Sequence, residues 1–297
     1  MPTIHAATAN GVRSWDTAGE RDVALDGRHI TGLARADDDI WAVADHRELW
    51  KRSPDGWTHV VDAGSRATCI ASIDGRLWVG TSEAHLLTLR DGALHEVDAF
   101  DHVPGRDAWY TPWGGPPDAR SIANWDDDVY VNVHVGGIPR TDDGGATWTP
   151  TIDIDADVHQ VTTAEGLVLA ACAEGLAVSA DRGASWWMRT EGLERTYCRA
   201  VAVCGDDVLL SSSDGPRGGR ATVSRAPLSG GTFEPVDAGL GSFDGNIDTM
   251  CLDALPDASV VAFGTEDGSL YVSGDAGATW DELASSLPQV RRVLVMP

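Results

Sequence analysis

The sequence predicts an all-β protein, a seven-bladed β-propeller of four-stranded blades, and three observations carry that prediction. One octapeptide pattern recurs three times along the chain. Each copy closes a longer unit of short strands with a period of about 30 to 45 residues, which is the length of one propeller blade. The two ends of the chain supply complementary parts of one more unit.

The octapeptide predicts a tight turn between two strands. Its copies are TDDGGATW at residues 141–148, SADRGASW at 179–186 and SGDAGATW at 273–280, with weaker copies at 53–57 and 224–233. In this pattern the Asp carboxylate accepts backbone N–H groups, Gly permits a positive φ, and Trp packs into the core beside the turn. We therefore expect Asp143, Asp181 and Asp275 to be structural residues between the two outer strands of a blade, and not catalysts.

The repeated units define the blades of a single domain, residues 1–297. Strands of about four to six residues, rich in Val, Leu and Trp and bounded by Gly and Asp, leave almost no room for helix. The six complete blades are predicted at approximately residues 28–64, 65–100, 117–152, 156–192, 196–240 and 246–285.

The two ends of the chain predict the seventh blade. The segment IHAATANGVRSWD, from Ile4, aligns with the second and third strands of the last repeat but has no first strand before it. The segment VRRVLVMP, at residues 290–297, is a first strand without followers. Pairing them makes a blade from residues 288–297 with 1–27 and closes the ring, which removes two exposed sheet edges. The alternative is an open ring of six blades with frayed ends.

The charge balance excludes two classes of partner. The chain has 22 Lys and Arg against 46 Asp and Glu, a formal net charge of −24. Such a surface repels phosphate groups, so we expect no nucleic acid and no anionic membrane as a partner. Scattered carboxylates also indicate a halophilic protein, because a hydrated acidic surface stays soluble in concentrated salt.

The cysteines and the amino terminus indicate a cytoplasmic protein. The five cysteines form an odd set without a CxxC pair and lie in apolar segments, which favours free buried thiols in a reducing compartment. The amino terminus has no basic segment followed by an apolar one, and no apolar run approaches the roughly 20 residues that cross a bilayer.

The octapeptides resemble the Asp-box, or BNR repeat, of the sialidase-like superfamily of β-propellers. The segments TPWGGPPDARS, NVHVGGI, DVHQV, YCRA and NIDT look like uncharacterised bacterial and haloarchaeal sialidase-like propellers, and the chain is also similar to photosystem II assembly factor-like propellers. Asp-box propellers include glycoside hydrolases, receptors and assembly factors, so the resemblance implies a fold and leaves the activity open. The chain departs from true sialidases, which have six blades and a Phe-Arg-Ile-Pro element.

The first strand of each blade lines the channel of a propeller, so equivalent positions form rings. Aligning the blades gives one ring of Thr31, Thr68, Arg120, His159, Arg199, Asp248 and Arg291, and a second ring, two residues earlier, of His29, Arg66, Asp118, Asp157, Tyr197, Asn246 and Gln289. Both rings are polar, and arginines gather there in an otherwise acidic chain. Arg66, Arg120, Arg199 and Arg291 therefore predict a site for a small anion, unless the carboxylates neutralise them internally.

Further candidates lie in loops on the same face. His134 follows a second strand, and the insertion at residues 98–117 carries Trp109, Tyr110 and Trp113. Aromatic side chains beside polar loops are typical of sugar binding, although the same residues could form a lid packed on its own core.

Two chemistries could be assembled from these residues. In a glycoside hydrolase, two carboxylates act across a glycosidic bond, with Asp118, Asp157 and Asp248 as candidates and His159 beside them. Alternatively, His134 and His159, with His85 or Asp157, could bind a divalent metal, although no HxH or HExxH spacing supports this. We assign no cofactor and no metal.

The sequence favours a propeller that binds a small anionic or carbohydrate-like ligand through these channel residues, with hydrolysis of a glycosidic bond left open. The alternative function is that of a non-catalytic scaffold that docks a protein partner on the same face. A deep polar pocket would favour the first function, and a broad exposed patch would favour the second.

Overall fold

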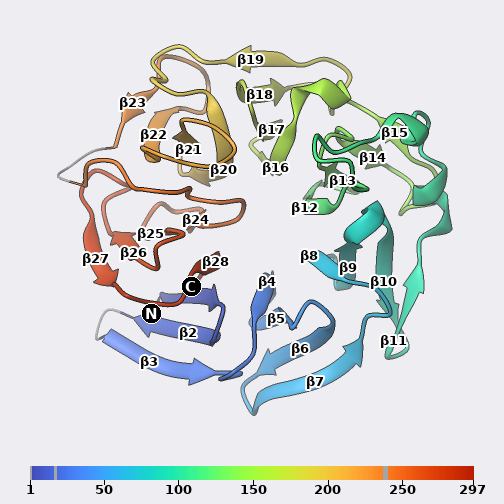
Figure 1. The fold of residues 1–297 in the computed structure, drawn as a ribbon, viewed down its shortest axis with the longest axis horizontal. Helices are drawn as coiled ribbons and strands as arrows, with labels where there is room; N and C mark the ends of the chain where they lie inside the picture. The colour runs from blue at the N-terminus through green and yellow to red at the C-terminus, as the bar shows by residue number, and fades with distance from the viewer. Residues whose placement is uncertain (1, 17–18, 237–239) are drawn as a thin grey trace. The chain divides into compact units, whose positions relative to one another are not determined.

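Seven four-stranded sheets make up the described part of the chain, which comprises residues 2–16, 19–236 and 240–297 of a computed structural model (Figure 1). Within every sheet, the strands follow one another in chain order except where the two ends of the chain meet. Short polar turns join them, as expected for antiparallel neighbours. The chain is therefore an all-β, seven-bladed β-propeller, as the repeats predict.

The strand bounds are as follows. One sheet combines β28 (Val290–Met296), β1 (Thr3–Thr8), β2 (Gly11–Asp16) and β3 (Gly19–Ala24). The next three sheets are β4 (Ile30–Ala36), β5 (Asp39–Ala44), β6 (Glu48–Ser53) and β7 (Gly56–Asp62); β8 (Ala67–Ile73), β9 (Arg76–Thr81), β10 (Leu86–Arg90) and β11 (Ala93–Glu96); and β12 (Ala119–Trp125), β13 (Asp128–Val133), β14 (Pro139–Thr141) and β15 (Thr149–Pro150). The last three are β16 (Val158–Ala164), β17 (Leu167–Cys172), β18 (Gly175–Ser179) and β19 (Trp187–Arg189); β20 (Tyr197–Cys204), β21 (Asp207–Ser213), β22 (Thr222–Pro227) and β23 (Glu234–Pro235); and β24 (Leu252–Ala254), β25 (Val261–Gly264), β26 (Leu270–Ser273) and β27 (Asp281–Ala284).

Among the described residues, helix is confined to 3₁₀ segments of three to five residues. These are η1 (Ser82–Ala84), η2 (Asp98–His102), η3 (Arg106–Ala108) and η4 (Ile154–Ala156). In the part of the chain that the structure describes, no helix is long and apolar enough to cross a membrane.

The chain divides into two compact units. The first comprises residues up to 30, 171–176 and 188–297, and the second comprises residues 31–170 and 177–187. The sheets that contain β1, β20 and β24 belong to the first unit, and those that contain β8 and β12 belong to the second.

The two ends of the chain meet in one sheet. Strand β28 pairs antiparallel with β1, from Met296 opposite Thr3 to Val290 opposite Thr8, and the marked termini lie together in Figure 1. The pairing supplies the first strand that the amino-terminal repeat lacks. The prediction that the carboxyl-terminal strand completes the seventh blade is confirmed, and the alternative of an open ring of six blades with frayed ends is wrong.

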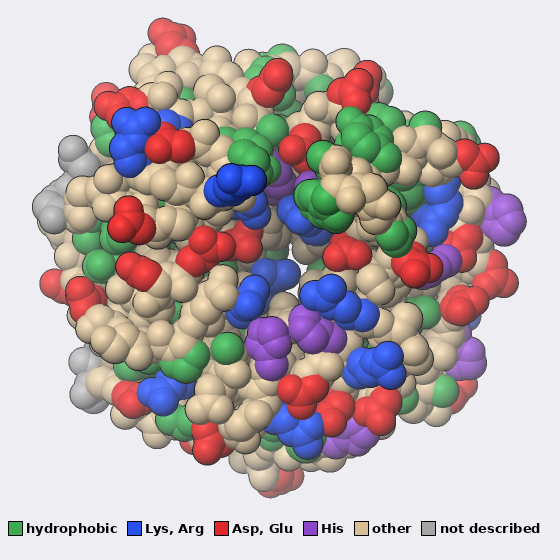
Figure 2. Space-filling model, viewed as in Figure 1, with side chains coloured by type: hydrophobic (Ala, Val, Ile, Leu, Met, Phe, Trp, Pro, Cys, Tyr) green, Lys and Arg blue, Asp and Glu red, His purple; other side chains and the backbone are tan. Residues whose placement is uncertain are grey.

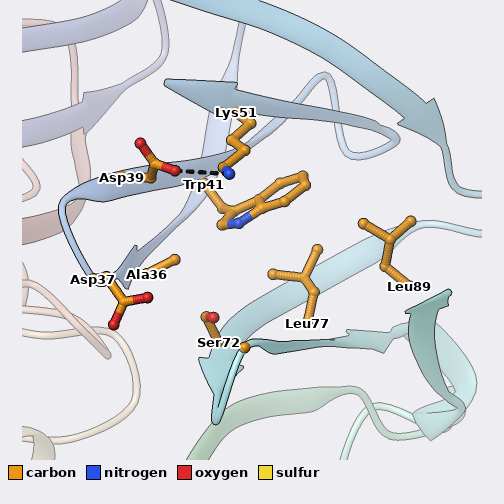
Figure 3. Close-up of a pocket in the computed structure, with 9 residues that line it drawn as sticks. Ala36, Asp37, Asp39, Trp41, Lys51, Ser72, Leu77 and Leu89 are labelled. Atoms are coloured by element: carbon orange, nitrogen blue, oxygen red, sulfur yellow. Dashed lines mark ion pairs between the residues drawn. The ribbon is translucent and has the colours of Figure 1, made fainter. Parts of the chain in front are cut away.

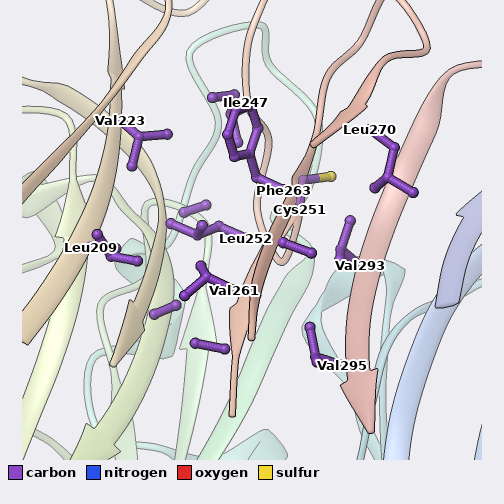
Figure 4. Close-up of a cluster of buried hydrophobic side chains, with 14 of the residues drawn as sticks. Leu209, Val223, Ile247, Cys251, Leu252, Val261, Phe263, Leu270, Val293 and Val295 are labelled. Carbon is purple, nitrogen blue, oxygen red and sulfur yellow. The ribbon is translucent and has the colours of Figure 1, made fainter. Parts of the chain in front are cut away.

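The core of the first unit is packed between its sheets. Leu252 and Val261 of the β24–β27 sheet lie between Leu209 on one side and Val293 and Val295 on the other (Figure 4). All five side chains are buried. The Val and Leu residues of the strands form this apolar layer, while the polar turns between the strands lie outside it.

The core of the second unit contains aromatic side chains from an octapeptide and from the insertion. Trp148, the last residue of the first octapeptide, packs edge to face against Phe100 of η2 and Trp78 of β9, at ring-centroid distances of 4.9 and 6.2 Å. Trp148 is only 5% exposed. The octapeptide thus anchors an outer turn to the core between two sheets.

The three octapeptides form the same turn between the third and fourth strands of their sheets. In the first, Asp143 Oδ1 accepts the Thr141 hydroxyl and the Thr147 N–H at 2.8 and 2.9 Å, and Oδ2 accepts the Thr147 hydroxyl at 2.7 Å. Asp181 and Asp275 accept the equivalent bonds from their own neighbours. These carboxylates are occupied by the turn, which agrees with the structural role predicted for them.

The five cysteines, Cys69, Cys172, Cys198, Cys204 and Cys251, are free and buried, as predicted. Burial raises the pKa of Cys204 to about 11 and that of Cys251 to about 12, and it raises the pKa of Cys198 as well. A thiol with a raised pKa is a poor nucleophile at neutral pH, so these three residues are core residues.

We expect Trp148→Ala to destabilise the protein by about 3 to 5 kcal/mol, because it leaves a cavity between Trp78 and Phe100. The matched control is Trp113→Ala, since Trp113 is 68% exposed and its loss leaves the core intact. Urea unfolding followed by tryptophan fluorescence measures both. Equal stability of the two variants would mean that the octapeptide Trp does not anchor the turn.

Candidate functional site

The site is built on two inner strands of the second unit, β12 and β16. The Ser121 hydroxyl of β12 accepts the backbone N–H of Val161 in β16 at 2.9 Å, and the Thr163 hydroxyl donates to the carbonyl of Asn124. These bonds hold the two strands at a fixed register. As a result, the residues that begin β16 lie close to the loop that follows β13.

Three side chains converge there: His134 after β13, and Asp157 and His159 at the start of β16. His134 Nε2 lies 3.2 Å from Asp157 Oδ1, and His159 Nε2 lies 3.6 Å from Asp157 Oδ2. The side chain of His159 is 0% exposed, that of His134 is 6% exposed, and that of Asp157 is 24% exposed. One carboxylate therefore faces two buried imidazoles.

Local backbone conformation directs Asp157 into this cluster. The residue ends the 3₁₀ turn η4 with φ 46° and ψ 65°, in the left-handed region, and its N–H donates to the carbonyl of Ile154 at 3.3 Å. Asp adopts this conformation more readily than most residues. A strained residue at a cluster of polar groups is common in functional sites.

Asp118 lies next to the same histidine. It precedes β12, and its backbone carbonyl accepts the N–H of His134 at 3.0 Å. Burial raises the pKa of the Asp118 carboxyl, and the charges of Arg66 and Arg120 offset this effect only in part. Two arginines, a half-buried carboxyl group and a histidine thus act on one another within a single unit.

The protonation states in the cluster differ. Burial alone would raise the pKa of Asp157, but its contacts with His134 and His159 outweigh burial and hold that pKa below its usual range. Burial lowers the pKa of His134, against the pull of Asp157. Because burial disfavours the charged form of His134, we take Asp157 as the ion in this pair at neutral pH.

The predicted aromatic residues of the insertion divide into two groups. Trp109 packs on Phe100 at 6.1 Å and under the guanidinium of Arg106 at 4.8 Å, so it belongs to the core. Trp113 instead stacks on the ring of His134 at 5.0 Å, with 28° between the planes, and is 68% exposed. Tyr110 is also exposed. The lid interpretation fits Trp109, and Trp113 offers an open aromatic face beside the cluster.

The site candidates of the first unit are held by partners of their own. Arg199 donates to Asp248 Oδ1 at 2.8 Å and to the carbonyl of Pro216 at 2.9 Å, and its guanidinium lies 5.4 Å from the ring centre of Tyr197. Asp248 lies in a loop before β24, not in the strand position that the alignment predicted. Here the carboxylate neutralises the arginine, which is one of the two outcomes that the sequence left open.

Two further candidates of the first unit are not part of that pair. Asn246 is buried and accepts the Ser213 hydroxyl at 2.8 Å, while its N–H donates to Glu266. Arg291 lies in β28, half-buried.

One polar residue of the second unit escaped the sequence predictions. Asn132 is 0% exposed, and neither its side-chain nitrogen nor its oxygen has a hydrogen-bond partner. It pairs across the sheet with Ser121, the residue that contacts Val161, and it lies two residues before His134. The sequence could have indicated this residue, because Asn132 is the only side-chain amide in the otherwise mostly apolar strand DVYVNV.

A separate pocket of about 160 Å³ holds none of the predicted residues. Lys51 pairs with Asp39 at 2.7 Å and lies above Trp41, with Ser72 and Leu77 on the opposite wall (Figure 3). Asp39 neutralises Lys51, and Asp37 also lines the pocket, so its lining carries a net negative charge that does not suit an anionic ligand.

The surface around these sites is acidic but not segregated. Figure 2 shows carboxylates spread over the visible face, with arginine side chains among them. A site that gathers arginines therefore stands out electrostatically against its surroundings, because the chain as a whole carries a net charge of −24.

The fold places the chain in the class of seven-bladed β-propellers, and comparison with solved structures agrees. An ancestral GH74 enzyme matches with a TM-score of 0.66 and 14% identity, over 86% of this chain and 39% of that one. YCF48 bound to D1 peptide matches with a TM-score of 0.60 and 13% identity, over 92% and 86%. The WD40 repeats of RRP9 match with a TM-score of 0.66 and 16% identity, over 97% and 86%.

At such identities the likeness shows the fold alone, and the chain spans well under half of the GH74 enzyme. No family model and no curated protein matches this sequence. The neighbours include both enzymes and a peptide-binding propeller, so the fold leaves the function open.

We expect Asp118→Asn to raise the unfolding temperature at neutral pH. An acid whose pKa is higher in the folded chain loses stability on ionising, and this loss begins above its unfolded pKa of about 3.9. The increase in unfolding temperature should therefore become smaller as the pH falls toward this unfolded pKa. Thermal unfolding followed by circular dichroism, without added divalent cations, measures it.

Asp38→Asn, on an exposed turn, serves as the control for this measurement. A lower unfolding temperature of Asp118→Asn at neutral pH would contradict the prediction. It would mean that the ionised carboxylate stabilises the fold through Arg66 and Arg120.

Proposed function

We propose that this propeller binds a small anionic, carbohydrate-like ligand at the cluster formed by Arg66, Arg120, Asp118, His134 and Trp113. The observation that carries the proposal is the stacking of the exposed Trp113 on His134. The charge of Arg120 acts on this histidine, and the charges of Arg66 and Arg120 both act on the neighbouring Asp118. The site would thereby offer a ligand one aromatic face and the positive charge of two arginines. An acidic sugar has a ring that packs on the first and a carboxylate that pairs with the second.

The arginines would supply the charge recognition. Arg66 is exposed, and its Nε donates to His46 Nδ1 at 3.2 Å, which orients the guanidinium. Arg120 is half-buried, and its charge adds to burial, the larger cause, in lowering the pKa of His134. A guanidinium fork binds a carboxylate through two parallel hydrogen bonds, and it does so more strongly where water is partly excluded.

Trp113 would supply the contact with the sugar ring. Its indole is held from below by the imidazole of His134 and is open on the other side. Apolar faces of sugar rings pack on such surfaces, and the hydroxyl groups then need polar partners. The Asp118 carboxyl group would supply one of these partners.

Hydrolysis of a glycosidic bond is a second candidate function. It is favoured by the opposite shifts of two carboxyl groups, since burial raises the pKa of Asp118 while Asp157 stays ionised. A proton donor and an ionised carboxylate are the pair that glycosidases use. The similarity to a GH74 enzyme is compatible with this chemistry.

The remaining assignments agree with this proposal. The octapeptide pattern and its turn geometry support Asp-box repeats of the sialidase-like kind. Five free buried thiols support a reducing, cytoplasmic location, and the net charge of −24 supports a halophilic protein.

The proposal is tested by thermal shift and calorimetry with glucuronate, and with glucose as its uncharged counterpart. We expect glucuronate to raise the unfolding temperature and glucose to have a smaller effect. Arg120→Ala and Trp113→Ala should each weaken glucuronate binding by about tenfold or more, in line with the loss of one charged or stacking contact.

Arg90→Ala, at the exposed end of β10, is the matched arginine control and should bind as the wild type does. Equal binding of glucose and glucuronate, or unchanged binding by Arg120→Ala, would contradict the proposal. Binding of a short peptide through its carboxylate, with no response to either sugar, would favour the scaffold function instead.

A further inference from the structure

We propose that His134, Asp157 and His159 bind a divalent transition-metal ion. The inference goes beyond anion binding and does not depend on it. These three residues each offer one ligand atom, and the three atoms all lie within 4.8 Å of one another. Two imidazoles and one carboxylate are the donor set that Zn²⁺, Mn²⁺ and Fe²⁺ take in proteins.

The distances between the Asp157 oxygens and the imidazole nitrogens are close to those between two ligands of one metal ion. Two ligands bonded to one tetrahedral ion at about 2.0 to 2.2 Å are separated by about 3.4 Å. The two contacts of Asp157 with the imidazoles measure 3.2 Å, through Oδ1 to His134, and 3.6 Å, through Oδ2 to His159, so both are close to that value.

The two contacts with Asp157 are also poor hydrogen bonds. The longer one exceeds hydrogen-bond range. The shorter one lies at the upper end of that range, and the buried Asp157 Oδ1 has no hydrogen-bond partner among the described residues. A buried carboxylate oxygen normally has a partner. An ion between the three side chains would supply it.

The neighbouring residues hold the ligands in place. Trp113 stacks on His134 and fixes the plane of its ring. The left-handed backbone and the N–H bond to Ile154 fix Asp157, and the hydrogen bond of Val161 to the Ser121 hydroxyl ties the strand of His159 to β12. Preorganised ligands of this kind raise the affinity for a metal, because less is lost in ordering them.

The local charge also permits a cation. Arg66 and Arg120 act on this region, but Asp118 and Asp157 balance them in number. An ion held by three protein ligands keeps at least one coordination position open for water or for an oxygen of a ligand. In this arrangement Asp157 is a metal ligand and not a glycosidase carboxylate.

The histidine that the sequence offered as an alternative ligand is engaged elsewhere. His85 Nδ1 lies 2.8 Å from Asp101, which also pairs with Arg106. The metal hypothesis for His134 and His159 thus acquires Asp157 as its third ligand. Histidine–carboxylate pairs outside the site, such as His59 with Asp62 at 2.7 Å, provide matched controls.

The test is titration of the chelator-treated protein with Zn²⁺ against a chromophoric chelator, in molar KCl to suppress binding by surface carboxylates. We expect one ion per chain. His134→Gln and Asp157→Asn should each weaken Zn²⁺ binding by about 100-fold or more, since each removes a direct ligand. His59→Gln should leave it unchanged.

Co²⁺ in place of Zn²⁺ gives a second readout, because its visible absorption reports ligands bound to the ion. Circular dichroism and thermal unfolding without metal confirm that each variant is folded, and His134→Gln and Asp157→Asn are used because both side chains retain some exposure. Arg66→Ala should keep Zn²⁺ binding, which separates failure of this inference from failure of anion binding. Absence of binding at micromolar Zn²⁺, or full binding by the two ligand variants, would overturn the inference.

Discussion

Side-chain hydroxyl groups that link inner strands are the interaction on which the site depends. In the second unit, Ser121 accepts the N–H of Val161, and Thr68 donates to the carbonyl of Ala119 at 2.5 Å. In the first unit, Ser211 of the second strand β21 makes a similar link to the loop before β24, donating to the carbonyl of Ile247 at 2.9 Å. Among the described residues, inner strands of different sheets are not paired in a common sheet, so these short links help to set their relative register. The convergence of His134 with Asp157 and His159 follows from that register.

The fold could be predicted because its signals are local or strictly periodic. The octapeptide encodes its own turn through Asp143 and Thr147, and this chemistry needs no distant partner. The complementary ends predicted the pairing of β28 with β1 for a similar reason, since a missing first strand and a surplus one are visible in the alignment. The expected period of two grouped Asp157 with His159, and the structure brings them within 3.6 Å, although Asp157 lies in the turn before β16.

The finer features of the site could not be predicted, because they depend on packing between distant segments. Nothing near Arg199 in the sequence shows that Asp248 neutralises it across 49 positions. Trp109 and Trp113 lie in one loop, yet one is core and the other is exposed, and only the position of Phe100 and His134 separates them. Asn132 was overlooked because burial of a polar group is invisible when the partner strand is unknown.

The cluster combines what an anion and a cation each need: two arginines beside Asp118, and two imidazoles around Asp157. The most direct test of this arrangement is anomalous diffraction at the zinc edge from crystals grown with Zn²⁺. One strong peak within about 2.0 to 2.2 Å of His134 Nε2, His159 Nε2 and an Asp157 oxygen is the expected result. A zinc ion bound only by surface carboxylates, with Asp157 unchanged between the two imidazoles, would contradict it.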